Sequence, residues 1–125
     1  MTVKETMDFI KRKYEAKINK ATENISKEIS EKQTENYRNF DKFKQEMSDF
    51  ITEKAKEEGF KISNHISVSI YTAFVSTDEL EELKLKKQEI VSALEKEKEQ
   101  FLDEIMILGV KDETIKEKLK KLLEI

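Results

Sequence analysis

The sequence predicts a mainly α protein with one short β segment, an α+β fold that assembles as a coiled-coil-like oligomer. Three observations lead to this prediction. Apolar residues recur at steps of three and four over most of the chain and alternate with polar residues in one short stretch. The 125 residues include two Gly and no Pro, so few positions can interrupt a helix. We expect a single domain over residues 1–125.

The first predicted element is a long helix over residues 3–58. Thr2 and Glu5 match the capping-box pattern found at helix starts, and neither Pro nor Gly follows before Gly59. Apolar positions form one stripe with a mean step of about 3.7 residues, close to the period of a straight α-helix. The polar run 30–36 leaves an alternative open, a hinge at which the helix folds back on itself.

A change of period marks the second element, a β segment over residues 60–75. Gly59 suits the end of the preceding helix, because glycine readily adopts the left-handed conformation found there. From Phe60 onwards apolar and polar side chains alternate, as in a strand with one buried face. Asn64 and His65 are placed to form a turn, so we predict a strand or a hairpin.

Two more helices complete the predicted layout. Ser76 begins a second capping box, which predicts a helix over residues 77–108 with apolar positions at three- and four-residue steps. Gly109 ends this helix. Asp112 is a candidate N-cap for a short last helix over residues 113–125.

Two features predict a homo-oligomer, most simply one based on a dimer. An isolated strand or hairpin leaves backbone groups unpaired at its edges and is only marginally stable in water. The second helix is also too short to cover the first along its length. A second copy of the chain can supply both missing partners. The alternative is a monomer in which a break at 30–36 produces a four-helix bundle capped by the hairpin.

The expected oligomer or partner interface combines an aromatic stripe on the first helix with one face of the β segment. Large apolar residues at helical spacing usually pack against another helix, and otherwise form an exposed patch for a partner protein. The predicted interface residues are Tyr37, Phe40, Phe43, Met47, Phe50, Ile66, Val68 and Ile70.

No pattern in the sequence predicts an enzyme, a cofactor site or a metal site. The chain has no Cys and one histidine, His65, whereas zinc and di-iron sites normally need more ligands of these kinds. Carboxylates occur in mixed-charge runs typical of solvated helix faces. Nucleophile elbows and glycine-rich phosphate loops are absent from the sequence. We therefore expect no catalytic, cofactor-binding or metal-ligating residues.

The charge distribution bears on possible partners. Residues 1–20 carry six basic and three acidic side chains, a net charge of +3, and include Lys11, Arg12 and Lys13. Such a cluster can contact phosphates, but the interleaved acidic residues and the chain's net charge of -3 disfavour nucleic-acid binding. Acidic side chains outnumber basic ones over residues 78–125, which suggests an acidic face that fits a basic groove on another protein.

From these patterns we expect a non-enzymatic protein-interaction protein that acts as a helical homo-oligomer, such as a scaffold, an assembly factor, a chaperone-like adaptor or a regulator. One alternative is a small phage or mobile-element inhibitor that binds and blocks a host protein. Another is a weak nucleic-acid binder that uses the Lys-rich N-terminal helix. No apolar run approaches 18 residues, so we expect neither a membrane span nor a secretory signal, and a cytoplasmic location.

Overall fold

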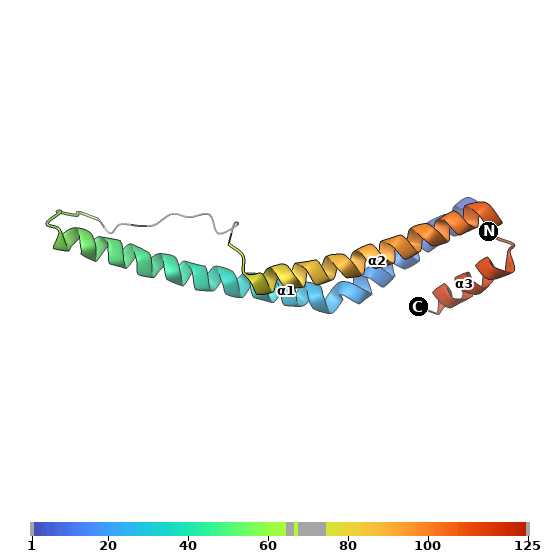
Figure 1. The fold of residues 1–125 in the computed structure, drawn as a ribbon, viewed down its shortest axis with the longest axis horizontal. Helices are drawn as coiled ribbons and strands as arrows, with labels where there is room; N and C mark the ends of the chain where they lie inside the picture. The colour runs from blue at the N-terminus through green and yellow to red at the C-terminus, as the bar shows by residue number, and fades with distance from the viewer. Residues whose placement is uncertain (1, 65–66, 68–74, 125) are drawn as a thin grey trace. The chain divides into compact units, whose positions relative to one another are not determined.

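A computed structural model describes residues 2–64, 67 and 75–124, and within them the chain forms three α-helices (Figure 1). Helix α1 spans Val3–Glu57, helix α2 spans Asp78–Leu108 and helix α3 spans Glu113–Leu123. The first and last residues of each helix lie within two positions of those predicted from apolar periodicity and end signals.

The predicted α+β fold class is wrong, because the described residues contain helices and no strand. Residues 60–64, predicted to begin the β segment, form coil and a bend, and Phe60 is exposed instead of facing inward. Residues 65–66 and 68–74 lie outside the described part of the chain, together with the predicted turn residue His65 and the predicted inward-facing residues Ile66, Val68 and Ile70.

Capping of α1 explains why the β pattern does not start at Phe60. Gly59 has a φ of 88° and donates its N–H to the carbonyl of Lys56 at 3.0 Å. The N–H of Phe60 is donated to the carbonyl of Ala55, also at 3.0 Å, which completes a Schellman motif. The Phe60 amide therefore serves the helix end and is not available to a β ladder.

The other helix ends are also held by short-range hydrogen bonds. Thr2 Oγ1 accepts from the N–H of Glu5 at 3.1 Å, as its capping pattern indicates. Asp112 Oδ1 accepts from the N–H of Thr114 at 2.9 Å at the start of α3. At the start of α2 the hydroxyl that accepts a backbone N–H belongs to Thr77, one residue after the predicted Ser76.

Helix α1 continues through the polar run 30–36, so the alternative with a hinge there is wrong. Thr34, which lies in this run, donates its hydroxyl to the carbonyl of Ser30 at 3.0 Å within α1. The four-helix monomer depended on a break at this point and loses its structural basis.

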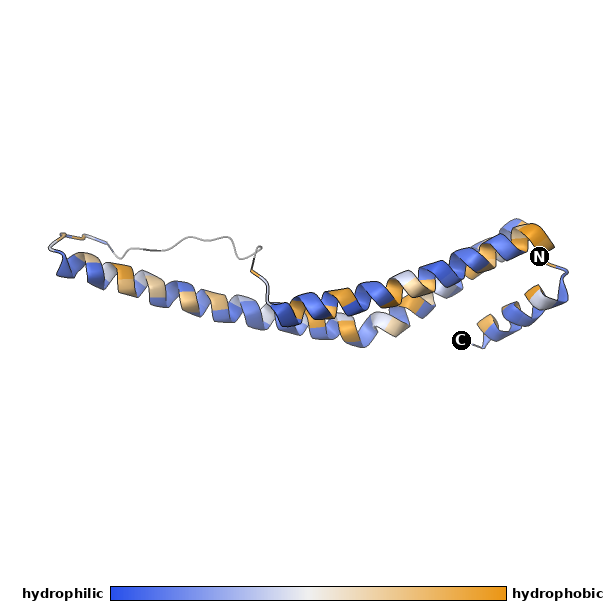
Figure 2. Cartoon of the chain, in the orientation of Figure 1, coloured by the Kyte–Doolittle hydropathy of each residue, from blue (hydrophilic) through white to orange (hydrophobic). Residues whose placement is uncertain are grey.

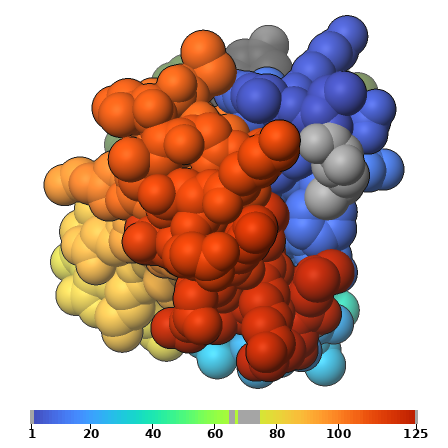
Figure 3. Space-filling view, turned by 90° about the vertical axis from the view of Figure 1, so that its right-hand side faces the viewer, coloured from blue at the N-terminus to red at the C-terminus, as the bar shows by residue number. Residues whose placement is uncertain are grey.

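The chain divides into two compact units, Met1–Lys27 with Leu83–Ile125, and Glu28–Glu82. In the first unit α3 lies across the seam between α1 and α2 (Figure 3). Its core consists of side chains from all three helices, and the buried members are Ile10, Tyr14, Phe101, Leu102, Ile105, Ile115 and Leu122.

The second unit has a more polar interior. Leu80 is buried there, but the other buried side chains among its described residues are Asn36, Ser48 and Thr52. Asn36 Nδ2 donates to Thr77 Oγ1 at 3.2 Å, a contact that joins α1 to the residue before α2. None of the three helices in the described part of the chain combines the length and apolarity of a membrane span.

Candidate functional site

The aromatic residues predicted for the interface lie on the second half of α1, and several remain exposed. Phe43 and Phe50 are 48% and 62% exposed, whereas Phe40 and Met47 are half-buried. Because Phe43 and Phe50 are two helical turns apart, they share one line of the helix. We call Phe40, Phe43, Met47 and Phe50 the aromatic strip.

Tyr37 is exposed but does not belong to this strip. It precedes Phe43 by six residues, which places it about 120° around the helix. Tyr37 lies about 60° from Phe40, the first residue of the strip, and its place in the interface stays a prediction. Ile66, Val68 and Ile70, the remaining predicted interface residues, are outside the described part.

One end of the strip borders a shallow hollow. The Phe40 and Phe43 ring centroids are 5.7 Å apart with the rings tilted by 35°, a favourable aromatic contact. With Val75 and Thr77 these rings line a hollow of about 220 Å³. Phe40 and Phe43 thus belong both to the strip and to the lining of this hollow.

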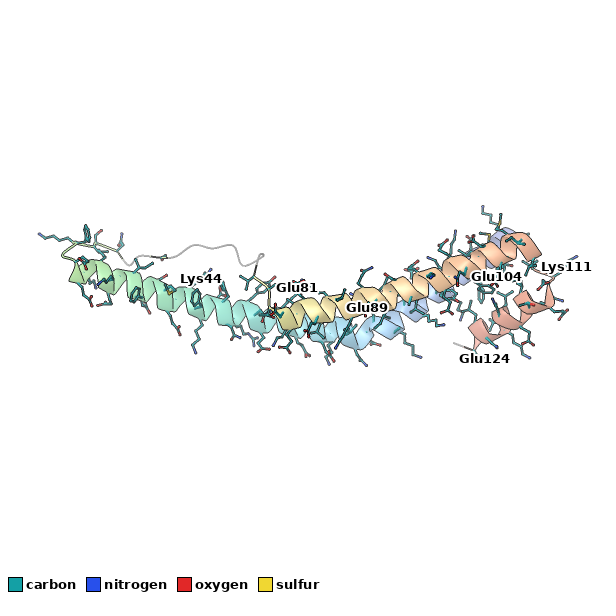
Figure 4. All side chains as sticks on the ribbon, viewed as in Figure 1. Lys44, Glu81, Glu89, Glu104, Lys111 and Glu124 are labelled. Atoms are coloured by element: carbon teal, nitrogen blue, oxygen red, sulfur yellow. The ribbon has the colours of Figure 1, made fainter. Side chains whose placement is uncertain are left out.

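Charged residues flank the strip. Lys42 precedes Phe43 and Asp49 precedes Phe50, so the two charges lie two turns apart on one flank. Asp49 Oδ1 accepts a hydrogen bond from Gln45 Nε2 at 3.1 Å. On the other side of the strip, Lys44, labelled in Figure 4, forms an ion pair with Asp41 at 3.6 Å. Both sides of the strip therefore carry charges of both signs.

An ion-pair cluster holds the start of α2 against α1 within the second unit. Lys32 Nζ lies 2.7 Å from Glu79 Oε2 and 3.5 Å from Glu35 Oε2. The hydrogen bond to Glu79 is the main cause that raises the pKa of Lys32 above its ordinary value. Lys32 therefore stays charged near neutral pH, and this cluster serves to position α2.

A second feature is a hollow of about 290 Å³ where the three helices of the first unit meet, here called the three-helix hollow. Sequence reasoning missed it, because no periodicity shows how α3 lies on the other two helices. Its lining residues are Tyr14, Lys17, Glu97, Gln100, Phe101, Glu104, Lys118, Lys121 and Leu122.

Two lysine–glutamate pairs border the three-helix hollow. Lys17 Nζ lies 3.5 Å from Glu97 Oε1 and 5.4 Å from the centroid of the Tyr14 ring. Lys118 is paired with Glu104, which is labelled in Figure 4 on the part of α2 beside α3. The Lys118 ammonium also lies 5.7 Å from the centroid of a buried ring, that of Phe101. Ammonium groups therefore lie above an aromatic floor.

The Tyr14 hydroxyl donates to Glu97 Oε1 at 3.0 Å. Burial of the ring is the largest cause that raises the pKa of Tyr14 well above its usual value, and the hydrogen bond and negative charge of Glu97 act in the same direction. The phenol therefore remains protonated and a donor across the whole physiological pH range.

This shift predicts how stability depends on pH. A tyrosine whose pKa is raised by folding stabilises the fold fully below its unfolded pKa of about 10, and the contribution is lost as pH rises towards the folded value. Between about pH 10 and 12, we expect urea unfolding to show a steeper loss of stability for the wild type than for Tyr14→Phe. Equal slopes for the wild type and Tyr14→Phe would contradict the assignment.

The last turn of α2 is a third exposed apolar feature, here called the apolar tip. Met106, Ile107 and Leu108 are all exposed, with Ile107 at 81%, and Figure 2 colours this end of α2 as hydrophobic. Three consecutive residues span about 200° of an α-helix, so one neighbouring helix cannot cover them all. The sequence contains a sign of this exposure, because a run of consecutive apolar residues is wider than the apolar stripe of one helix face.

In the described residues no three His, Asp or Glu side chains converge to hold a metal ion. Comparison of the chain with protein-family models, curated proteins and solved structures finds no match. Functional inference therefore depends on the aromatic strip, the three-helix hollow and the apolar tip.

Proposed function

We propose that this protein is a non-enzymatic protein-interaction protein that acts as a homo-oligomer assembled through the aromatic strip. The observation that supports this function is the exposure of Phe43 and Phe50 on one line of α1. Burying a Phe side chain contributes roughly 1.5–3 kcal/mol, which a second copy of the chain would provide. Scaffold, assembly-factor, adaptor and regulator roles are all consistent with such an assembly.

The charges beside the strip favour an antiparallel pair of α1 helices. Buried Ser48 lies on the other side of the strip from Lys42, so a second copy approaches over the Lys42 flank. If Phe43 of one copy lies against Phe50 of the other, Lys42 of each copy comes near Asp49 of its partner. A parallel pair in register would instead place like charges together.

The same arrangement has a cost that can be tested. Residue numbers that face each other across the antiparallel pair add up to about 93, so the two copies of Glu46 lie beside the two-fold axis. Like charges at this distance repel. Glu46→Gln is therefore expected to strengthen assembly.

The decisive experiment is light scattering on a sizing column over a range of concentrations. We expect a wild-type mass of at least twice 14.8 kDa. Lys42→Glu and Asp49→Lys should each weaken dimerisation by roughly two- to tenfold, since exposed ion pairs contribute about 0.2–1 kcal/mol each. The double variant exchanges the two charges and should recover the wild-type dissociation constant.

Each outcome of this experiment has a definite meaning. A wild type that is monomeric at all concentrations would overturn the homo-oligomer. A dissociation constant that is unchanged by Lys42→Glu, by Asp49→Lys and by Glu46→Gln would overturn the antiparallel arrangement. Lys96→Glu, a charge reversal on an exposed α2 position away from the strip, is the control and should leave the dissociation constant unchanged.

A second candidate function is that of a small inhibitor that blocks another protein, and the apolar tip favours it. Because its three side chains face several sides of α2, they suit a cup-shaped pocket better than a helix surface. Ile107→Glu should remove such blocking without changing the mass of the homo-oligomer. Nucleic-acid binding has less support, since Lys17 contacts Glu97 and Lys13 lies 5.8 Å from the centroid of the Phe9 ring.

A further inference from the structure

We propose that the three-helix hollow binds a small amphipathic monoanion, an aliphatic carboxylate of medium chain length. The proposal is independent of the homo-oligomer, because the hollow and the aromatic strip share no residue and lie in different compact units.

The floor of the hollow suits an apolar chain. The Tyr14 and Phe101 rings and the Leu122 side chain are buried members of the core, and all three border the hollow. Small-molecule sites are mostly apolar with a few polar groups, and typical volumes are about 300–1,000 Å³. At about 290 Å³ the hollow lies just below this range, which favours a small ligand.

The rim of the hollow suits a single negative charge. Its lining includes three lysines and two glutamates, a net charge of +1. Lys17 and Lys118 are each paired with one of the glutamates, and Lys121 supplies the additional positive charge. A monoanion would neutralise the hollow, whereas a cation would have to compete with Lys118 for Glu104.

The positions of the ammonium groups give the expected orientation. Those of Lys17 and Lys118 lie within 6 Å of ring centroids that form the floor, at 5.4 and 5.7 Å. A carboxylate placed between these groups and Lys121 leaves its hydrocarbon chain against Phe101 and Leu122. The Tyr14 hydroxyl donates its one proton to Glu97 and so holds that carboxylate at the edge of the same space.

Isothermal titration calorimetry with decanoate, kept below its micelle-forming concentration, tests the proposal. We expect saturable binding of one decanoate per chain. Lys121→Gln should weaken binding by roughly two- to fivefold, the loss expected for one exposed ion pair. Lys120→Gln is the matched control, because Lys120 is an exposed neighbour that does not line the hollow, and it should bind like the wild type. Decyltrimethylammonium, with a similar chain and the opposite charge, should not compete.

Three results would overturn the proposal. The first is the absence of saturable heat with decanoate. The second is equal affinity of the Lys121→Gln and Lys120→Gln variants, which would place decanoate elsewhere, such as on the aromatic strip. The third is effective competition by decyltrimethylammonium, which would show binding by apolar contact alone. Because Lys121 is exposed, both variants should keep the wild-type circular dichroism spectrum, and this is checked first.

Discussion

Replacing Ile105 by Ala is expected to lower the free energy of unfolding by about 2–5 kcal/mol. Ile105 is 1% exposed and belongs to the core where α1, α2 and α3 meet, so the substitution removes buried methyl groups and leaves a cavity. The measurement is urea denaturation followed by circular dichroism. All proteins are compared at one fixed concentration, because the assembly that we propose would also contribute to the observed stability.

Ile107 provides a matched control for this prediction. It is the same residue type, two positions further along α2, and 81% of it is exposed. Ile107→Ala should change the unfolding free energy by less than about 0.5 kcal/mol, as is usual for surface substitutions. If both variants were equally destabilised, the apolar tip would be buried in the folded protein. If neither were, the three-helix core would be incorrect.

The double variant Phe43→Glu/Phe50→Glu is expected to convert the homo-oligomer into a monomer. A symmetric dimer buries two copies of each ring. Full burial of a Phe contributes roughly 1.5–3 kcal/mol, and these rings are 48% and 62% exposed before assembly, so the lost contribution is about 3–6 kcal/mol. Introducing four carboxylates into the same contact adds a desolvation penalty. Assembly at micromolar concentrations should therefore disappear in light scattering, while the helical circular dichroism signal is retained.

Leu85→Glu controls for the general effect of a new surface charge. Leu85 lies on α2 and is 60% exposed, close to the 62% of Phe50, but it is not part of the strip. Its variant should retain the wild-type mass. Dissociation by Leu85→Glu, or a persistent oligomer in the double Phe variant, would show that the contact between copies uses another surface.

Local sequence signals predicted the helical parts of the fold well. Thr2 and Asp112 accept the backbone hydrogen bonds that their positions indicate, and Gly59 ends α1 with a positive φ. These features depend on residues within a few positions of one another, so they can be recognised without a three-dimensional arrangement. The start of α2 shows the limit of such predictions. Ser76 was predicted as its cap, but the neighbouring Thr77 accepts the backbone hydrogen bond, because two adjacent hydroxyl residues can each fill this position.

The β prediction failed because alternation describes side chains, while a strand requires paired backbone groups. At Phe60 the amide that would begin a ladder is donated to Ala55. Phe40, Phe43, Met47 and Phe50 follow one another along α1, and Tyr37 lies about 60° around the helix from Phe40 and about 120° from Phe43. The three-helix hollow could not be predicted, since its residues come from distant segments of the chain; Tyr14 and Glu97, for example, are 83 positions apart.

By itself the sequence determined the three helices and their ends, because apolar periodicity and caps act over one or two helical turns. Only the tertiary structure decided that α1 continues through residues 30–36, that Ile105 is buried while Ile107 is exposed, and that lysines from α1 and α3 border one hollow. The physical reason is that burial and charge pairing depend on which helix faces are brought together. Contacts between distant segments determine which helix faces pack together, and no local sequence pattern specifies these contacts.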